Sequence, residues 1–142
     1  EGGFTPEAAA GMQAGLRADP EGFLTSFLTN FHSVPGDGEP RLMVPREQVS
    51  AAIEVAKQAS LDALAICIGL WLTDFRADLA AMSVPTLVIH GDGDQIVPFP
   101  ASGRRMPHFV PDAEVHVISG GPHGVLASHP DEVAAALLVF LA

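Results

Sequence analysis

The clearest strand signal of this chain lies in Val84-Pro-Thr-Leu-Val-Ile-His-Gly-Asp-Gly-Asp-Gln-Ile-Val-Pro98. Its part Pro85–Gly91 is a continuous run rich in β-branched residues that ends in glycine, which is typical of a strand buried on both faces of a sheet. Glu114–Ser119 is a second expected strand. The segment between them should cross over as a helix, although Gly103 and Pro107 make it a poor one. The sequence therefore predicts two parallel strands joined by a crossover.

Helices are expected before and after these strands in the sequence. The C-terminal helix begins with a Ser-x-x-Asp capping pattern at Ser128, so that strand, crossover, strand and helix form a βαβα unit over residues 84–142. Residues 1–83 contain no strand signal and predict a helical segment, which is interrupted by a proline- and glycine-rich loop over His32–Pro45. Helices in this segment should begin after three capping residues, Thr5, Asp19 and Ser60.

The composition excludes several functional classes. The 142 residues include 17 acidic and 7 basic side chains, and the net charge of −10 repels phosphate backbones, so no nucleic-acid partner is expected. A single cysteine cannot form an internal disulfide, which indicates a reducing compartment and predicts a cytoplasmic protein. The longest unbroken apolar run, Ala63–Leu72, is too short to span a bilayer, and no secretion signal is expected.

Two polar, glycine-containing loops follow the carboxyl ends of the two expected strands, where parallel sheets bind ligands. The first loop carries Asp92 and Asp94, and the second carries His123. An aspartate that accepts a hydrogen bond from a histidine N–H fixes the imidazole tautomer and makes a competent general base. The residues alone leave other interpretations open. The aspartates could be turn residues, His123 could be an exposed loop residue, and His90 could join all three in a metal site, although this spacing matches no standard ligand pattern.

Together, residues 84–98 and the loop Ser119–Gly124 resemble the C-terminal half of an α/β-hydrolase, most closely the bacterial cofactor-free haloperoxidases, which are esterases with perhydrolase side activity. The resemblance extends over nearly the whole chain, because the preceding helical stretch looks like that family's cap domain. It implies that Asp94 is the acid and His123 the base of a catalytic triad, with Asp92 the less favoured acid. No metal ion and no organic cofactor is implied.

The sequence does not contain the nucleophile of that family, which is a serine in a Gly-x-Ser-x-Gly turn. The oxyanion hole is missing as well, since its donors come from the residue after the nucleophile and from the family's N-terminal half. The substitutes that the sequence offers are Ser119, Ser102, Cys67 and an activated water molecule. For each of the three side chains a structural or inert role is the favoured interpretation, and the apolar surroundings of Cys67 predict a buried thiol.

At 142 residues the chain is about half of the fold to which its motifs belong. The expected fold class is thus α/β, a truncated α/β-hydrolase with a helical cap segment over 1–83 and a parallel βαβα unit over 84–142. The expected function is a carboxylic-ester hydrolase that acts on short-chain esters through Asp94 and His123, with a non-standard or missing nucleophile. The alternative is a non-catalytic hydrolase remnant or interaction module, which needs a partner chain for the serine and the oxyanion hole.

Two parallel strands do not make a self-sufficient sheet. The strand Thr86–His90 would leave a flat, β-branched edge exposed, and such an edge is a template for another chain. A homo-oligomer is therefore expected, formed through this strand edge or through the cap helices.

Overall fold

The computed structural model describes residues 4–142, and their contacts form two compact units. The helical unit consists of the described part of Glu1–Thr29 together with Pro45–Asp74, and the sheet unit consists of Asn30–Val44 and Phe75–Ala142. The expected boundary between residues 83 and 84 therefore differs from the grouping by contacts. One physical reason is that the Gly124 N–H donates to the Phe31 carbonyl at 2.9 Å, which ties the end of a helix from the first third of the chain to the sheet unit.

The helical unit is built from α1 (Pro6–Ala18), α2 (Pro20–Phe31, whose last two residues belong to the sheet unit), α3 (Arg46–Ala56) and α4 (Leu61–Leu70). The expected helix starts are confirmed: the side chains of Thr5 and Ser60 accept the N–H groups of Ala8 and Ala63 at 3.2 and 3.1 Å. The Asp19 carboxylate likewise accepts the Gly22 N–H at 2.9 Å. The core of the unit lies between α1 and α4 and contains Ala9, Leu16, Ala65 and Ile68.

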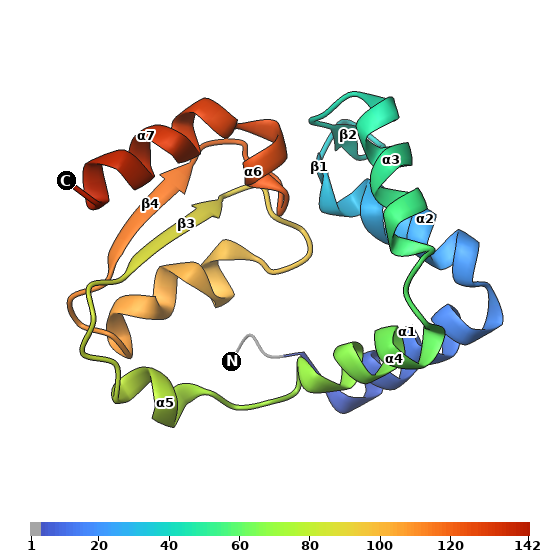
Figure 1. Cartoon of the computed structure of the whole chain (residues 1–142), viewed down its shortest axis with the longest axis horizontal. Helices are drawn as coiled ribbons and strands as arrows, with labels where there is room; N and C mark the ends of the chain where they lie inside the picture. The colour runs from blue at the N-terminus through green and yellow to red at the C-terminus, as the bar shows by residue number, and fades with distance from the viewer. Residues whose placement is uncertain (1–3) are drawn as a thin grey trace. The chain divides into compact units, whose positions relative to one another are not determined.

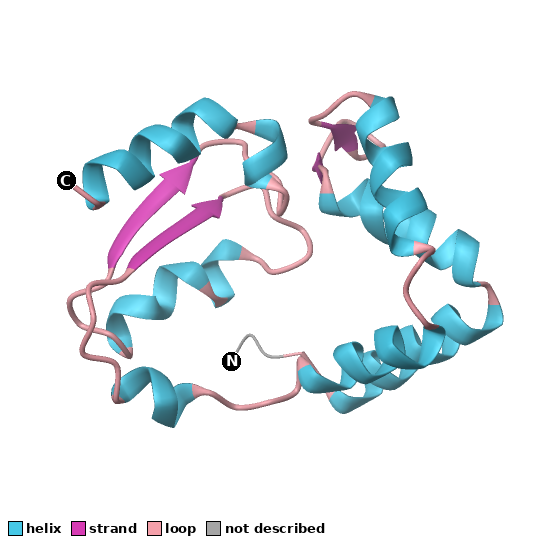
Figure 2. Ribbon diagram, viewed as in Figure 1, coloured by secondary structure: helices cyan, strands magenta, loops and turns pink. Residues whose placement is uncertain are grey.

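The sheet unit is centred on two parallel strands, β3 (Leu87–Gly91) and β4 (Glu114–Ile118), which pair with Leu87 opposite Glu114 (Figure 1). The helix α5 (Arg76–Ala80) precedes them, and α6 (Val125–Ser128) and α7 (Pro130–Phe140) follow. One face of the sheet packs against α6 and α7 in a core of Ile89, Ile118, Val125 and Val133. Figure 2 shows helices on both sides of the strand pair, as a βαβα unit requires.

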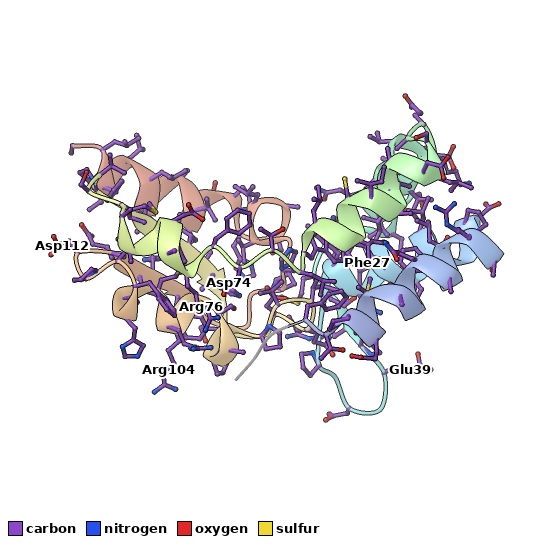
Figure 3. All side chains as sticks on the ribbon, turned by 90° about the horizontal axis from the view of Figure 1, so that it is seen from below. Phe27, Glu39, Asp74, Arg76, Arg104 and Asp112 are labelled. Atoms are coloured by element: carbon purple, nitrogen blue, oxygen red, sulfur yellow. The ribbon has the colours of Figure 1, made fainter. Side chains whose placement is uncertain are left out.

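The crossover between the strands consists of two 3₁₀ helices, η1 (Phe99–Ala101) and η2 (Gly103–His108), instead of an α-helix. Pro107 lies inside η2, where it cannot donate a helical hydrogen bond. Gly103 is required at the start of η2, because a Cβ atom there would lie 2.5 Å from Nδ1 of His90. Figure 3 shows the exposed side chain of Arg104 projecting outward from η2.

The structure corrects two sequence predictions. The region expected to be a strandless loop contains a small antiparallel hairpin, β1 (Ser33–Val34) with β2 (Arg41–Leu42), whose strands are too short to produce an alternating pattern. The predicted helix cap at Ser128 is wrong as well. Ser128 ends α6, its Oγ lies within hydrogen-bond distance of the Gly124 carbonyl and of His129 Nδ1, and His129 occupies the N-cap position of α7.

The strand β3 is less buried than its composition predicts. Its residues Leu87 to His90 are half-buried and only Gly91 is fully buried. The reason is that, among the described residues, β4 is the one strand that pairs with β3. None of the described helices is long and apolar enough to cross a membrane.

Candidate active site

The loop after β3 places the carboxylate of Asp94. The Asp94 N–H donates to the Gly91 carbonyl at 3.3 Å, which bends the chain directly after the strand. Its Oδ1 accepts the N–H groups of Ile96 and Val97 at 2.8 and 2.9 Å. An aspartate that binds backbone groups two and three residues further on stabilises a tight turn. The turn interpretation is therefore right for Oδ1, and it leaves the second oxygen, Oδ2, for another partner.

That partner is His123, whose Nδ1 lies 2.7 Å from Asp94 Oδ2. The Asp94 side chain is 2% exposed and the His123 side chain 30% exposed. The two loops meet because β3 and β4 are neighbouring parallel strands with their carboxyl ends at the same edge of the sheet. An ionised carboxylate only accepts hydrogen bonds, so Nδ1 carries the proton of this bond. The neutral imidazole then keeps its lone pair on Nε2, which can take up a proton.

The environment of Asp94 favours the ionised carboxylate. Burial on its own raises the pKa of this carboxyl group. The hydrogen bonds from His123, Val97 and Ile96, together with the charge of His123, outweigh burial and lower the pKa of Asp94 below its ordinary value of 3.8. At neutral pH the buried group is thus an anion facing an imidazole, which is the arrangement that stabilises an imidazolium.

Asp92, the less favoured acid, has a different partner. Its Oδ1 accepts the N–H of Gly120 at 2.6 Å, and its backbone N–H donates to the Ile118 carbonyl at 3.1 Å. Gly120 has a φ of +66°, a left-handed conformation that favours glycine. Asp92 therefore joins the first loop to the second and helps to place His123, while the hydrogen bond to the imidazole comes from Asp94.

The close approach of the two loops depends on Gly91. A Cβ atom at this position would collide with the backbone of Gly121. The neighbouring Gly93 N–H donates to the Gly121 carbonyl at 3.0 Å, which adds another bond between the loops. Glycine at the end of β3 thus lets the loop of His123 lie directly on the loop of Asp94.

Two further residues at the site were not predicted from the sequence, namely Phe31 and His32 at the end of α2. The Phe31 ring meets the His123 imidazole edge to face, with the ring centroids 4.6 Å apart. The His32 ring packs against Gly124, and the residue is 7% exposed. Burial lowers the pKa of His32, so that its imidazole is neutral at neutral pH. In the sequence Phe31 was only the last residue of an apolar helical stripe, so no local pattern connects it with His123.

His90 is also part of the arrangement, although the sequence suggested it only as a member of a metal site. Its Nε2 lies 3.1 Å from Asp94 Oδ2 and 2.9 Å from the Val97 carbonyl oxygen. The described residues contain no cluster of three or more histidine, cysteine or acidic side chains with a geometry that could hold a metal ion. One sequence signal could have predicted the contact between His90 and Asp94. His90 lies at the end of a strand, four residues before Asp94.

None of the candidate nucleophiles forms a hydrogen bond with His123 in the described part of the chain. Ser102 donates its hydroxyl to the Pro98 carbonyl at 2.9 Å and lines a cavity of about 370 Å³ between β3, α5 and the crossover. Ser119 is an exposed turn residue. Cys67 belongs to the helical unit and is exposed, so the prediction of a buried thiol is wrong. The reason is that α4 is apolar all round, while only its face with Ala65 and Ile68 is buried.

Comparisons with known proteins agree on one family. A model described as "Alpha/beta hydrolase family" matches residues 2–136. A Synechocystis sp. protein with the provisional name non-heme chloroperoxidase is 35% identical over 131 residues, which cover 92% of this chain and 47% of the relative. A pimeloyl-[acyl-carrier protein] methyl ester esterase of Xanthomonas campestris is 35% identical over 130 residues, 89% of this chain and 49% of the relative.

The solved structures agree. The crystal structure of a bromoperoxidase from Bacillus anthracis superposes with a TM-score of 0.90 at 34% identity, over 97% of this chain and 49% of that one. The chain thus spans about half the length of the relatives that it matches, as the motifs predicted. It is a partial α/β-hydrolase with haloperoxidases and esterases as neighbours. By its sequence and by its fold, the chain belongs to the alpha/beta hydrolase family.

Proposed function

We propose that this chain carries the acid and base of a carboxylic-ester hydrolase, in which Asp94 holds His123 as the general base. One observation carries the proposal: the 2.7 Å hydrogen bond between Asp94 Oδ2 and His123 Nδ1. It joins a carboxylate that is 2% exposed to an imidazole that is 30% exposed. The anion is thereby shielded from water, while the base stays accessible to a small substrate.

The proposed reaction follows from the protonation states at this pair. Nε2 of His123 takes the proton from an attacking hydroxyl group or water molecule as the new C–O bond forms at the ester carbonyl. The imidazolium that results is stabilised by the Asp94 carboxylate, and it returns the proton to the leaving alkoxide when the ester C–O bond breaks. A positioned general base contributes on the order of 10²–10⁴-fold to such a reaction. That is enough to hydrolyse activated short-chain esters.

Esters are the substrate class that the relatives support best. The Xanthomonas campestris relative is named as a methyl ester esterase, and the proposal takes only the ester bond from that name. The nucleophile is a separate question, because Ser119, Ser102 and Cys67 have no hydrogen bond to His123 in the described residues and water is the remaining choice. In a longer protein the family's serine would come from a segment outside this chain.

A serine-directed phosphonate, followed by mass measurement of the intact chain, distinguishes these nucleophiles. We expect the purified chain to hydrolyse a nitrophenyl acyl ester without taking up the phosphonate, which indicates that His123 activates water. A single adduct together with turnover would instead locate an internal nucleophile by peptide mass. A chain with neither adduct nor turnover would contradict the esterase proposal for the 142-residue chain. A commercial serine esterase treated in parallel shows that the reagent is active.

A second candidate function is an interaction module that assembles with a second copy of this chain. The observation that favours it is the two-stranded sheet, in which one edge of β3 has no neighbouring strand among the described residues. Two such edges can pair about a twofold axis, because each offers backbone donors and acceptors to the other. We expect the sedimentation coefficient to increase with protein concentration. A monomer at every concentration would exclude this assembly.

A further inference from the structure

We infer that His90 is a positioning residue for the proposed acid–base pair, because its Nε2–H group, hydrogen-bonded to the Val97 carbonyl, lies 3.1 Å from the Asp94 oxygen that holds His123. This inference rests on the proposed function for its catalytic meaning. The geometry itself, in which two imidazoles share one carboxylate oxygen, stands without it.

The partners of His90 show which of its ring nitrogens carries a proton. Nε2 lies 2.9 Å from the Val97 carbonyl oxygen and 3.1 Å from Asp94 Oδ2. Both of these groups are acceptors, so Nε2 must carry a proton, which it donates to the Val97 carbonyl while the same N–H lies close to the Asp94 carboxylate. His90 thus connects the end of β3 to the far side of the Asp94 turn, whose carboxylate is held at both oxygens, Oδ1 by backbone N–H groups and Oδ2 by His123.

The ring of His90 has little freedom to leave this position. Its side chain is 14% exposed. The ring of Phe99 lies 5.4 Å from it, centroid to centroid, and the edge with Nδ1 lies against Gly103, where even a Cβ atom would be too close. The packing therefore selects Nε2 as the nitrogen that faces the Asp94 turn. A rigidly held donor loses little entropy when it binds, so this contact helps to fix the carboxylate.

The titratable groups around Asp94 make the role of His90 testable. His123 and His90 both contact Oδ2, and Asp92 in the same loop is engaged with Gly120. His32 lies behind Gly124, and Arg104 on η2 projects outward (Figure 3). Hydrogen bonds to the ionised form lower the pKa of a carboxyl group. The Nε2–H dipole of His90, 3.1 Å from Oδ2, favours the ionised form in the same sense, so its loss is expected to raise the pKa of Asp94, and loss of a distant imidazole is not.

The first test uses the unchanged chain. In long-range ¹H–¹⁵N spectra of the imidazoles at neutral pH, His90 is expected to carry its proton on Nε2. A His90 with the proton on Nδ1 alone would overturn the inference, since Nε2 would then present no N–H to the Val97 carbonyl and the Asp94 carboxylate. This measurement needs no variant and therefore does not depend on whether a substituted chain folds.

The second test follows the ¹³C carboxyl resonance of Asp94 in a pH titration of the full chain. In His90→Phe, which keeps a ring but removes the N–H group, we expect the Asp94 midpoint to rise to a measurably higher pH. His90→Gln restores an N–H at a similar reach and should recover part of the shift. The matched control is His116→Phe on β4, whose imidazole lies 3.3 Å from the Glu132 carboxylate and should leave Asp94 unchanged.

A folded His90→Phe chain with an unchanged Asp94 midpoint would overturn the inference, and so would a His90→Gln chain that titrates like His90→Phe. Both spectroscopic readouts are independent of turnover. If the chain hydrolyses no ester, the proposed function fails while the His90 contact can still be confirmed. If it does hydrolyse esters and the Asp94 midpoint does not move, only the role of His90 fails.

Discussion

Replacement of His123 by alanine is expected to reduce the hydrolysis of a nitrophenyl acyl ester to the rate measured without protein. The imidazole is the one group that Asp94 holds with an accessible second nitrogen, so its loss removes the proposed base completely. The expected decrease is the whole contribution of a positioned base, on the order of 10²–10⁴-fold. The measurement is the initial rate at saturating substrate.

The control for this variant must separate catalysis from folding. His116→Ala removes an imidazole from the same sheet unit, one that also faces a carboxylate, and it is expected to keep the parent rate. Circular dichroism of His123→Ala checks that the fold persists, because the variant leaves the Asp94 carboxylate buried without its imidazole partner. Equal rates for His123→Ala and the parent chain would refute the role of His123.

The second large effect is expected for Asp94→Asn. The asparagine carbonyl oxygen can still accept the N–H groups of Ile96 and Val97, so the turn should persist. Its amide NH₂ then faces His123 Nδ1, which must become an acceptor, and the imidazole proton moves to Nε2. An Nε2 that already carries a proton cannot act as the base, so we expect kcat to fall by on the order of 10²-fold.

Asp92→Asn is the matched control for Asp94→Asn, since it makes the same chemical change in the same loop. Its carbonyl oxygen can still accept the Gly120 N–H, which is the bond that Asp92 makes. We therefore expect this variant to retain most of the parent rate. A loss of equal size in Asp92→Asn and Asp94→Asn would mean that the loop as a whole, and not the Asp94–His123 hydrogen bond, supports turnover.

The sequence was enough to predict that the loops of Asp94 and His123 meet, because this prediction depends on strand topology and not on side-chain packing. Parallel neighbouring strands end at the same edge of a sheet, so polar loops after both strands must lie together. The contacts of His90 and Phe31 could not be predicted in this way. The first depends on how closely the His90 ring packs on Gly103 of η2, and the second joins residues that are far apart in the chain.

The fold was predictable where helix caps and β-branched runs are long enough to act locally. Thr5 and Ser60 cap the helices as expected, and the strand β4 begins at Glu114. The predictions failed where tertiary contacts outweigh local preference. At Ser128 the hydroxyl forms its contacts within the short helix α6 and with the next side chain, so the capping pattern does not start α7.

A double-mutant cycle on ester hydrolysis tests whether Asp94 and His123 act as one unit. Rates are compared for the parent chain, Asp94→Asn, His123→Ala and the chain with both substitutions. If Asp94 acts only through His123, the doubly substituted chain is no slower than His123→Ala alone. Losses from the two substitutions that multiply in the double variant would show that Asp94 and His123 act independently.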